Sequence, residues 1–556
     1  MVRAEGRTID IETRTLTARL ENGFLVSLKS RADGREHIEA PGAEGSALQL
    51  VYPGRGTIDV VGKLASTITT LQVSTTAAQF RLHGWDADGV MTVSEDEETG
   101  DLLVETSAYS SAPGVLACRW LMPGMATDLD LVAPFFQGVR LPLSDPLLQM
   151  RWPWPMFWEA GLAILQGKAG GFSIQCRDTH YRYKALNIEG GRLGLDTEAY
   201  GPVEESRGAG GLVWRIGVHN GDWSVPACDY RTWLWDAYDL EKAERQRLPW
   251  VGDIRLALSW YGGDPNVLDA LAERIDPKKV LIHYSQWRTD PYDENYPTYQ
   301  ASDDARAVIA KGREMGFHIM PHCNSVDMDP THPVYNAIRD FQYRDVQTRT
   351  LHGWGWDNES GSALGVPNSY TALAQNRQRK VMVKVHPGLS MWRSLLGEHI
   401  LSAVEDVGTD CVFIDVTLCS GNLSNCLVEN TTSSEGMKEL IGYIASLRGG
   451  LAVGGEGLNE ITMQNLSFAQ AHLFRSWQES IDGLERTGEC ALNSFLFGRL
   501  CRTFGYSGLS GGNEKEELRM RIHEKLGAIP TVVVSRAEQI RSPNRAVARV
   551  LKLAVE

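Results

Sequence analysis

The sequence predicts a multidomain β plus α/β protein, with an N-terminal antiparallel β-sandwich over residues 1–240 and a (β/α)8 TIM-type barrel over residues 248–556. Three observations support this fold class. Short alternating strands with turn signals fill the first part, strand-like and helix-like segments alternate in the second, and two late strands each end in a lone carboxylate. At 556 residues the chain is also too long for one ordinary core, which favours more than one domain.

The first part has the pattern of a sandwich. Segments 24–28, 102–106 and 211–218 alternate between apolar and polar residues and are separated by Gly, Asp and Pro. Regular short strands without intervening helices indicate a large antiparallel sandwich rather than βαβ units.

From Leu248 onward the pattern changes to alternating strands and helices. Strands are expected over 254–260, 280–287, 317–324, 380–386, 411–416, 451–456 and 529–535. Helices are expected over 264–274, 302–316, 390–406 and 434–448, and at the C-terminus. Asp264 is a candidate N-cap before Pro265, and Gly316 is a candidate helix end. Residues 458–528 give no clear strands. A doubly wound sheet stays an alternative, although no Gly-rich nucleotide-binding loop follows the first strand.

Composition excludes several classes of function. The formal net charge of −15 disfavours both nucleic-acid backbones and anionic membrane surfaces, which require clustered Lys and Arg. The sequence therefore predicts a neutral partner, with no nucleic acid, no membrane and no cofactor. Whether the chain is a monomer or a homo-oligomer stays open.

The sequence also favours a cytoplasmic location. Charges occur in the first ten residues, where a signal peptide would need an apolar core, and no apolar run reaches the roughly 18 residues of a membrane span. Nine cysteines without CxxC spacing are typical of reduced thiols.

Two carboxylates are the strongest functional signal. Asp415 ends the apolar run Cys411-Val-Phe-Ile-Asp415, and Glu456 ends Leu451-Ala-Val-Gly-Gly-Glu456. A carboxylate after a buried strand is costly unless the strand end opens into a polar cleft. Paired acids at the mouth of a parallel barrel are typical of glycosidic bond cleavage.

Other polar residues fall at the same ends of predicted strands. Because alternate residues of a strand share a face, His322 and Asn324 lie together on one strand, and Lys384 and His386 lie together on another. Active groups of such barrels lie at the C-terminal strand ends, so these residues are candidates for substrate binding. Trp287, Trp354 and Trp356 follow strand ends and are candidates for stacking on a sugar ring, with core packing as the competing interpretation.

Two alternatives concern the acids and histidines. Glu460 is an alternative to Glu456 for the acid/base role. Glu460 is expected near the start of a helix, where the helix dipole stabilises a charged carboxylate, so Glu456 is favoured as the acid/base. Glu460 stays a candidate for substrate binding. His318 and His322, with Asp327 and Asp329, are an alternative metal site, but no further well-spaced ligand follows, so no metal is predicted.

Longer segments then suggest a family. They are Gly408-Thr-Asp-Cys-Val-Phe-Ile-Asp415-Val, Gly454-Gly-Glu456-Gly, Gly316-Phe-His-Ile-Met-Pro-His-Cys-Asn324, Asn220-Gly-Asp-Trp-Ser and Tyr230-Arg-Thr-Trp233. Loosely and over most of its length, the chain resembles retaining glycoside hydrolases built as a galactose-mutarotase-like sandwich followed by a (β/α)8 barrel. The nearest likeness is to the α-N-acetylgalactosaminidases of glycoside hydrolase families 101 and 129, and the α-galactosidase clan is more distant. The resemblance implies that Asp415 is the nucleophile, that Glu456 is the acid/base and that Asp327 binds the sugar.

The expected function is therefore hydrolysis of small α-glycosides, of galactose or N-acetylgalactosamine type, by double displacement. This mechanism needs Asp415 ionised, with Lys384 as a candidate stabilising cation, while Glu456 is protonated. Retention predicts carboxyl groups about 5–5.5 Å apart, and inversion about 6.5–9.5 Å. A transglycosidase or phosphorolytic relative and a catalytically silent sugar-binding protein are the alternatives. The sugar, the anomeric linkage and exo or endo action stay open.

Overall fold

A computed structural model describes residues 1–39, 45–53, 58–61, 67–83, 87–143, 149–356, 363–365, 380–471, 488–505 and 521–556. The chain forms two compact units. The first contains Met1–Asp239, Gly421–Cys426 and Asp482–Leu492, and the second contains Leu240–Ser420, Leu427–Ile481 and Asn493–Glu556. Two short segments from the C-terminal half of the chain thus belong to the first unit.

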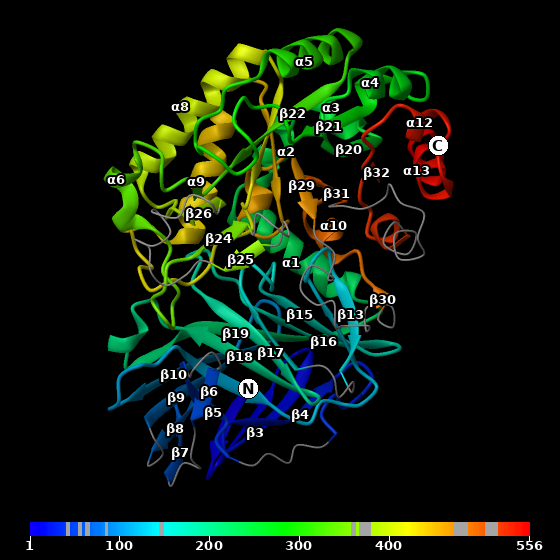
Figure 1. The fold of residues 1–556 in the computed structure, drawn as a ribbon. Helices are drawn as coiled ribbons and strands as arrows, with labels where there is room; N and C mark the ends of the chain where they lie inside the picture. Colours follow the sequence, from blue (N-terminus) through cyan, green and yellow to red (C-terminus); the bar gives the residue numbers. More distant parts are fainter. Residues whose placement is uncertain are drawn as a thin grey trace. The chain divides into compact units, whose positions relative to one another are not determined.

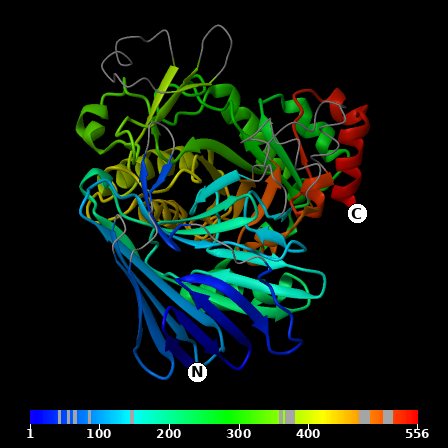
Figure 2. The ribbon, with the colours of Figure 1, turned by 90° about the horizontal axis from the view of Figure 1, so that it is seen from below.

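The first unit consists of antiparallel sheets, as the sequence predicts (Figures 1 and 2). One sheet has the order β1 (Val2–Glu5), β2 (Thr8–Glu12), β3 (Leu16–Glu21), β4 (Phe24–Ser30). The largest has the order β30 (Gly488–Glu489), β13 (Val139–Pro142), β12 (Asp130–Ala133), β15 (Leu162–Gln166), β16 (Gly170–Gln175), β19 (Gly208–Asn220), β10 (Leu102–Ser110), β9 (Ala87–Glu95), β8 (Ala77–His83), β7 (Thr67–Gln72). The third has the order β14 (Gln149–Pro153), β17 (Lys184–Glu189), β18 (Arg192–Glu198), β11 (Ala117–Met122), β5 (Leu48–Pro53), β6 (Ile58–Val61). The strands predicted at 24–28, 102–106 and 211–218 lie within β4, β10 and β19.

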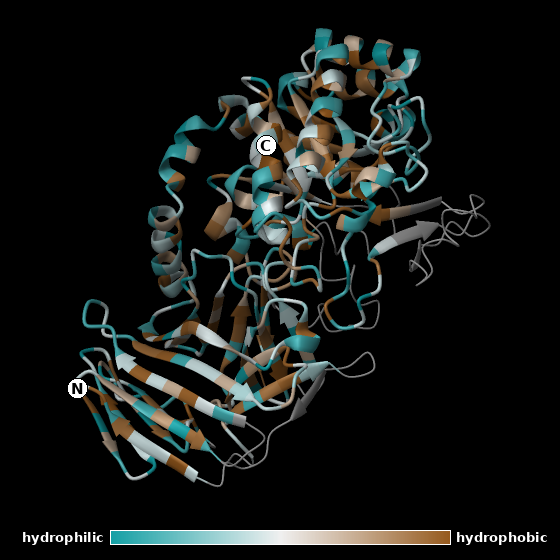
Figure 3. Cartoon of the chain, turned by 90° about the vertical axis from the view of Figure 1, so that its left-hand side faces the viewer, coloured by the Kyte–Doolittle hydropathy of each residue, from teal (hydrophilic) through white to brown (hydrophobic). Residues whose placement is uncertain are grey.

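Alternation along these strands builds the core of the first unit. In β10 every second residue is buried and most of the others are exposed, as period-two patterning requires. Figure 3 shows the result as alternating hydrophobic and hydrophilic bands along neighbouring strands. The 3-10 helix η1 (Val203–Glu205) and helix α1 (Ser224–Ala237) complete the unit.

The second unit contains a near-closed barrel of eight parallel strands. In chain order they are β20 (Leu256–Tyr261), β21 (Val280–Tyr284), β22 (His318–Asn324), β27 (Cys411–Asp415), β28 (Ala452–Glu456), β29 (Phe468–Ala471), β31 (Arg502–Gly505) and β32 (Thr531–Val532). Neighbours in the chain are also neighbours in the barrel. β32 pairs with β20, and Phe504 bridges Ile529, so the sheet returns to its first strand.

Helices and short 3-10 turns precede, connect and follow these strands. They are α2 (Leu240–Gln246), α3 (Pro249–Asp253), α4 (Pro265–Ala272), η2 (Pro277–Lys279), α5 (Asp303–Met315), α6 (Tyr335–Ile338), η3 (Arg339–Phe341), α8 (Ser390–Val407), α9 (Ser433–Ser446), η4 (Thr462–Gln464), α10 (Leu492–Phe497), α12 (Glu538–Arg541) and α13 (Arg545–Val555). Local signals set several boundaries as predicted. The Asp264 side chain accepts a hydrogen bond from the Asn266 N–H at the start of α4, and Gly316, with φ of 101°, ends α5.

One predicted barrel strand lies elsewhere. The sequence predicts a barrel strand at residues 380–386, but β26 (Lys380–Lys384) belongs to a four-stranded sheet with β23 (Asp327–Met328), β24 (Gly353–Trp356) and β25 (Ala363–Gly365). β26 runs antiparallel to β23 and β24. The apolar alternation predicts a strand correctly, but it does not state which sheet the strand joins.

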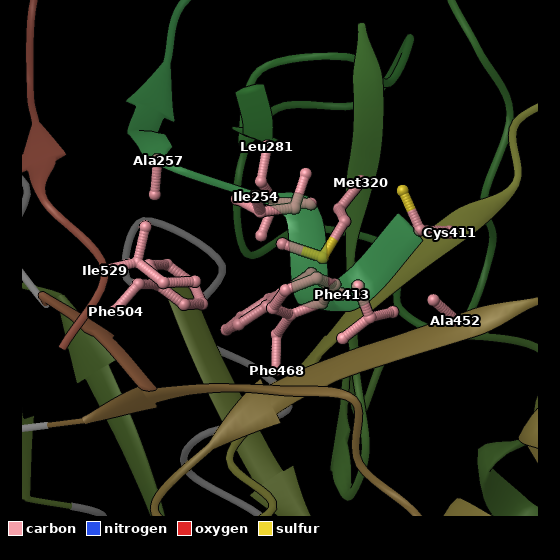
Figure 4. Close-up of a cluster of buried hydrophobic side chains, with 11 residues drawn as sticks. Ile254, Ala257, Leu281, Met320, Cys411, Phe413, Ala452, Phe468, Phe504 and Ile529 are labelled. Atoms are coloured by element: carbon pink, nitrogen blue, oxygen red, sulfur yellow. The ribbon is translucent and has the colours of Figure 1, made fainter. Parts of the chain in front are cut away.

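The barrel interior is closed by a cluster of apolar side chains. Met320, Phe413, Phe468 and Phe504 come from four barrel strands and point toward one another in Figure 4. Gly454 leaves room for them, since a Cβ atom there would lie 2.7 Å from the Met320 sulfur and 3.2 Å from the Phe413 ring. The polar strand ends lie beyond this apolar layer along the strands.

Candidate active site

Asp415 and Glu456 end two adjacent parallel strands of the barrel. β27 pairs with β28 so that Phe413 is level with Gly454 and Ile414 with Gly455, and the next residues are Asp415 and Glu456. The Asp415 side chain is 14% exposed and Glu456 is 7% exposed. The two acids therefore lie level with one another at the carboxyl ends of their strands, almost out of solvent.

The turn after Asp415 holds Glu456. The Val416 N–H donates to Glu456 Oε2 at 3.2 Å, and the Thr417 hydroxyl lies 2.7 Å from both the backbone N and O of Glu456. Val416 has φ of 66°, which is rare for a β-branched residue and marks a backbone held by its surroundings. This geometry directs the Val416 N–H to the carboxyl pair.

Ionisation of Asp415 is unfavourable at this position. Burial raises the pKa of Asp415 well above its usual range, and the charge of Glu456 raises it further. Asp327 and Asp293 add smaller effects in the same direction, while the Val416 N–H lowers the pKa of Asp415. Because the two carboxylates repel one another, ionisation of one makes ionisation of the other less favourable.

Asp327 and Lys384 form a buried ion pair beside this site. Lys384 Nζ lies 2.7 Å from Asp327 Oδ1, and Asn324 Nδ2 donates to Asp327 Oδ2 at 3.1 Å. Asn324 Oδ1 in turn accepts from the Asp327 N–H at 2.8 Å. Burial opposes the charge of Lys384, but Asp327, and to a lesser degree Asp415, outweigh burial and raise the pKa of the ammonium group.

These contacts change the role expected for Lys384. The sequence predicts that Lys384 reaches the site from a barrel strand and keeps the pKa of Asp415 low. Instead, β26 brings Lys384 to the site through its antiparallel pairing with β23, in which Lys384 is level with Asp327. Lys384 is thus bound to Asp327, and it also interacts with Asp415, although burial and the neighbouring acids raise the pKa of Asp415.

Two histidines extend from Asp415 into the barrel. His322 Nε2 lies 3.7 Å from Asp415 Oδ2, and His322 Nδ1 lies 2.9 Å from His283 Nε2. Both rings pack against Phe413, with ring centroids 5.4 Å and 4.3 Å away. His283 lies within β21, a strand whose polar residue the sequence interpretation did not use.

The loop after β21 contributes residues that the sequence interpretation also missed. Asp293 is buried and acts electrostatically on Asp415, and the Tyr292 ring centroid lies 5.2 Å from that of His322. Arg288 organises this loop by donating to the carbonyl oxygens of Pro291, Glu294 and Thr298. The segment Arg288-Thr-Asp-Pro-Tyr-Asp-Glu-Asn, polar and directly after a strand, was the available signal.

The tryptophan predictions have different outcomes. Trp287 is fully buried and its Nε1–H donates to the His322 carbonyl oxygen at 2.8 Å. It offers no face to a sugar, so the stacking prediction for Trp287 is wrong and the competing core interpretation holds. The backbone of Trp354 and Trp356 lies in β24, but their side chains are outside the described part of the chain, and their role stays a prediction.

His386 and Glu460 are both buried. His386 Nδ1 accepts from the Gly388 N–H at 3.0 Å, in the turn that leads to α8. Glu460 precedes η4, and its backbone carbonyl accepts from Gln464 Nε2. Glu456, and not Glu460, is among the groups whose charges act most on Asp415.

The alternative metal ligands are divided between two places. His318 Nδ1 contacts Asp410 at 2.8 Å, at the opposite end of β22 from His322, which contacts His283. Among the described residues, no cluster of His, Cys, Asp and Glu is arranged to hold a metal ion.

None of the described helices has the length and apolar composition needed to cross a membrane.

Comparisons with known proteins agree with this architecture. Residues 213–437 match the model of a family described as a domain of unknown function (DUF6259). No curated protein matches the chain.

Solved structures give a likeness over the whole chain. The chain is similar to the α-N-acetylgalactosaminidase NagBb from Bifidobacterium bifidum in complex with Gal-NHAc-DNJ, with a TM-score of 0.69, 13% identity, and coverage of 100% of this chain and 92% of that chain. The ligand-free form of NagBb gives a TM-score of 0.67 at 14% identity, covering 100% and 93%. A GH31 sulfoquinovosidase from E. rectale gives a TM-score of 0.54 at 11% identity, covering 100% and 82%. At the level of fold, the resemblance expected from the sequence is therefore confirmed: the chain has the fold of these glycoside hydrolase structures.

Proposed function

We propose that this protein is a retaining glycoside hydrolase with Asp415 as nucleophile and Glu456 as acid/base. The observation that carries the proposal is the pair of buried carboxyl groups at the ends of adjacent parallel strands, next to the Val416 N–H. Two carboxyl groups that retain one proton provide the acid and the nucleophile that double displacement needs.

The reaction follows from these roles. The ionised Asp415 oxygen attacks the anomeric carbon while Glu456 donates its proton to the glycosidic oxygen, and the alcohol leaves. Glu456 then takes a proton from water, whose oxygen attacks the anomeric carbon and releases Asp415. The buried Asp327, oriented by Asn324 and Lys384, is proposed to bind hydroxyl groups of the sugar.

The substrate and the domain roles complete the proposal. We propose α-glycosides of galactose or N-acetylgalactosamine type, supported by the fold shared with an α-N-acetylgalactosaminidase. The second unit would be the catalytic TIM-type barrel expected within residues 248–556, and the first the mutarotase-like sandwich expected over residues 1–240, joined by Gly421–Cys426 and Asp482–Leu492. A cytoplasmic location is proposed because all nine cysteines are free thiols.

A panel of nitrophenyl α- and β-glycosides tests the function, with the first product followed by NMR. The first product should have the anomeric configuration of the substrate, and Asp415→Ala should lower kcat by at least about a thousandfold. Asp410→Asn, directly before the start of β27, is the matched control and should retain turnover. Near wild-type turnover of Asp415→Ala, or a product of inverted configuration, would contradict the proposal.

A second comparison separates Glu456 from Glu460. Glu456→Gln should lower kcat on alkyl glycosides by about 10²–10⁴-fold, with a smaller loss on dinitrophenyl glycosides, whose leaving group needs no proton. Glu460→Gln should show no such dependence on the leaving group. If Glu460→Gln shows the dependence and Glu456→Gln does not, the two roles must be exchanged.

A further inference from the structure

A bulge in the first barrel strand starts a chain of hydrogen bonds that leads to His322, the histidine beside Asp415. The pairing of β20 with β21 shifts between Leu258 and Tyr261, where Trp260 has φ of 55°. This bulge turns the Trp260 N–H away from the regular ladder, and it donates to His283 Nδ1 at 3.4 Å. A backbone N–H can only donate, so His283 Nδ1 must be an acceptor.

This contact fixes the proton positions of both histidines. With Nδ1 as acceptor, neutral His283 carries its proton on Nε2 and donates it to His322 Nδ1, 2.9 Å away. His322 must then carry its own proton on Nε2. That atom is buried, has no hydrogen-bond partner within the described part of the chain, and lies 3.7 Å from Asp415 Oδ2.

A second proton on either ring would break the chain. A protonated His283 would direct its Nδ1–H at the Trp260 N–H, and a protonated His322 would direct its Nδ1–H at the Nε2–H of His283. Burial lowers the pKa of His283 to about 3, and burial, His283 and Arg288 lower the pKa of His322 well below its usual range. Both rings are therefore neutral around neutral pH.

We propose that His283 and His322 are positioning residues that hold a neutral N–H donor toward Asp415 and thereby assign the proton of the carboxyl pair to Glu456. This inference rests on the proposed function and explains how Asp415 becomes the ionised member. Lys384 interacts with Asp415 but is hydrogen-bonded to Asp327, and the acids Glu456, Asp327 and Asp293 all oppose a charge on Asp415. A neutral donor favours that charge without placing a second cation beside an anomeric centre that becomes positive in the transition state.

The tautomers can be measured without any substrate. In protein labelled with 15N at its histidines, both rings should be neutral with the proton on Nε2 between pH 5 and pH 8. His283→Gln and His322→Gln assign the two signals. A proton on Nδ1 of either ring, or a protonated ring in this range, would overturn the inference even if glycosidase activity is found.

The functional effect is measured on the acid limb of kcat/KM, which reports ionisation in the free enzyme. His322→Leu removes the donor, so Asp415 should ionise at higher pH and the limb should move upward by about one unit, a tenfold loss at a fixed acidic pH. His322→Gln retains a side-chain N–H and should recover most of that loss. His318→Gln, a histidine at the other end of the same strand, is the matched control.

The outcomes separate the two proposals. A His322→Leu protein that is less stable but has an unchanged acid limb would show a merely structural role and overturn the inference. Wild-type protein without activity on any glycoside would instead contradict the proposed function, and the 15N measurement would still decide the protonation of His283 and His322.

Discussion

At the scale of single residues, a charge on Asp415 is the feature of the site that most opposes folding. Its carboxyl group is buried beside other acids, and its pKa is raised. The sequence predicted this residue because an acid after the apolar run Cys411–Ile414 is conspicuous. It did not identify His283, because one histidine within an apolar strand has no pattern that separates a positioning role from packing.

Replacing Asp415 should stabilise the protein at neutral and alkaline pH. A carboxyl group with a raised folded-state pKa stabilises the fold where it is protonated, and that contribution is lost as pH rises through the raised pKa. Asp415→Asn resembles the protonated form, so its melting temperature should exceed that of wild type at pH 8 and match it near pH 4. Each kcal/mol gained corresponds to about 2–4 °C for a large domain.

Calorimetry with a matched variant tests whether the change at Asp415 raises or lowers stability. The pKa of Asp410, directly before the same strand, is lowered because its contacts with His318 outweigh burial, so Asp410→Asn should lose stability at pH 8. Equal or lower stability of Asp415→Asn at pH 8 would contradict the expected cost of the charge.

At the scale of elements, the antiparallel pairing of β23 with β26 places the Asp327–Lys384 ion pair beside the site of the parallel barrel. The sequence predicted the strand at 380–386 from its valines but placed it in the barrel, because alternation defines faces and not partners. The boundaries of α4 and α5 were predicted because capping residues act locally. The strands β29 and β31 were missed because segment 458–528 shows no regular alternation.

The Asp327–Lys384 pair should couple strongly in a double-mutant cycle. Lys384→Met leaves a fully buried Asp327 charge without its cation and should cost about 3–5 kcal/mol in urea denaturation. Adding Asp327→Asn should restore most of this stability, since the charge is removed while an oxygen remains for Asn324. The double variant should stay inactive, because the proposed sugar-binding carboxylate is lost.

Simple additivity of the two changes would contradict the buried pair. Recovery of both stability and activity in the double variant would instead contradict sugar binding by Asp327.

At the scale of the whole molecule, the first unit contains a buried charge network that acid should weaken. In the first unit, Asp196 is buried between Arg119 and Arg151 at 2.6 and 3.2 Å. Burial opposes its charge, but Arg119 and then Arg151 outweigh burial and lower the pKa of Asp196. Its contribution to stability is present above the ordinary Asp pKa and is lost as pH falls below it.

Asp196→Asn should therefore be destabilising at pH 7. The buried Arg119 and the partly buried Arg151 would lose their shared carboxylate, at a cost of about 3–5 kcal/mol. The difference from wild type should shrink as pH falls below about 4, where the unfolded chain takes up a proton at Asp196 while the folded protein still holds the carboxylate charged. Denaturant unfolding at pH 7 and pH 3 measures both values, and a difference that grows toward acid would contradict the charge network.

The general architecture was predictable from the sequence because each unit repeats one simple pattern many times. The sequence did not indicate which segments make up the first unit, because barrel strands separate Gly421–Cys426 and Asp482–Leu492 from the rest of that unit along the chain. No periodicity in residues 1–240 indicates that its largest sheet ends with β30, a two-residue strand from far along the chain.

That last strand has a consequence for synthesis. β30 pairs with the edge strand β13 through Val139–Glu489 and Arg140–Gly488. While the ribosome makes the intervening barrel at about 5–20 residues per second, the β13 edge waits for its partner on the order of tens of seconds. During that time an exposed edge can pair with another nascent chain. Translation speed and chaperone supply, rather than final stability, should therefore set the yield of this protein.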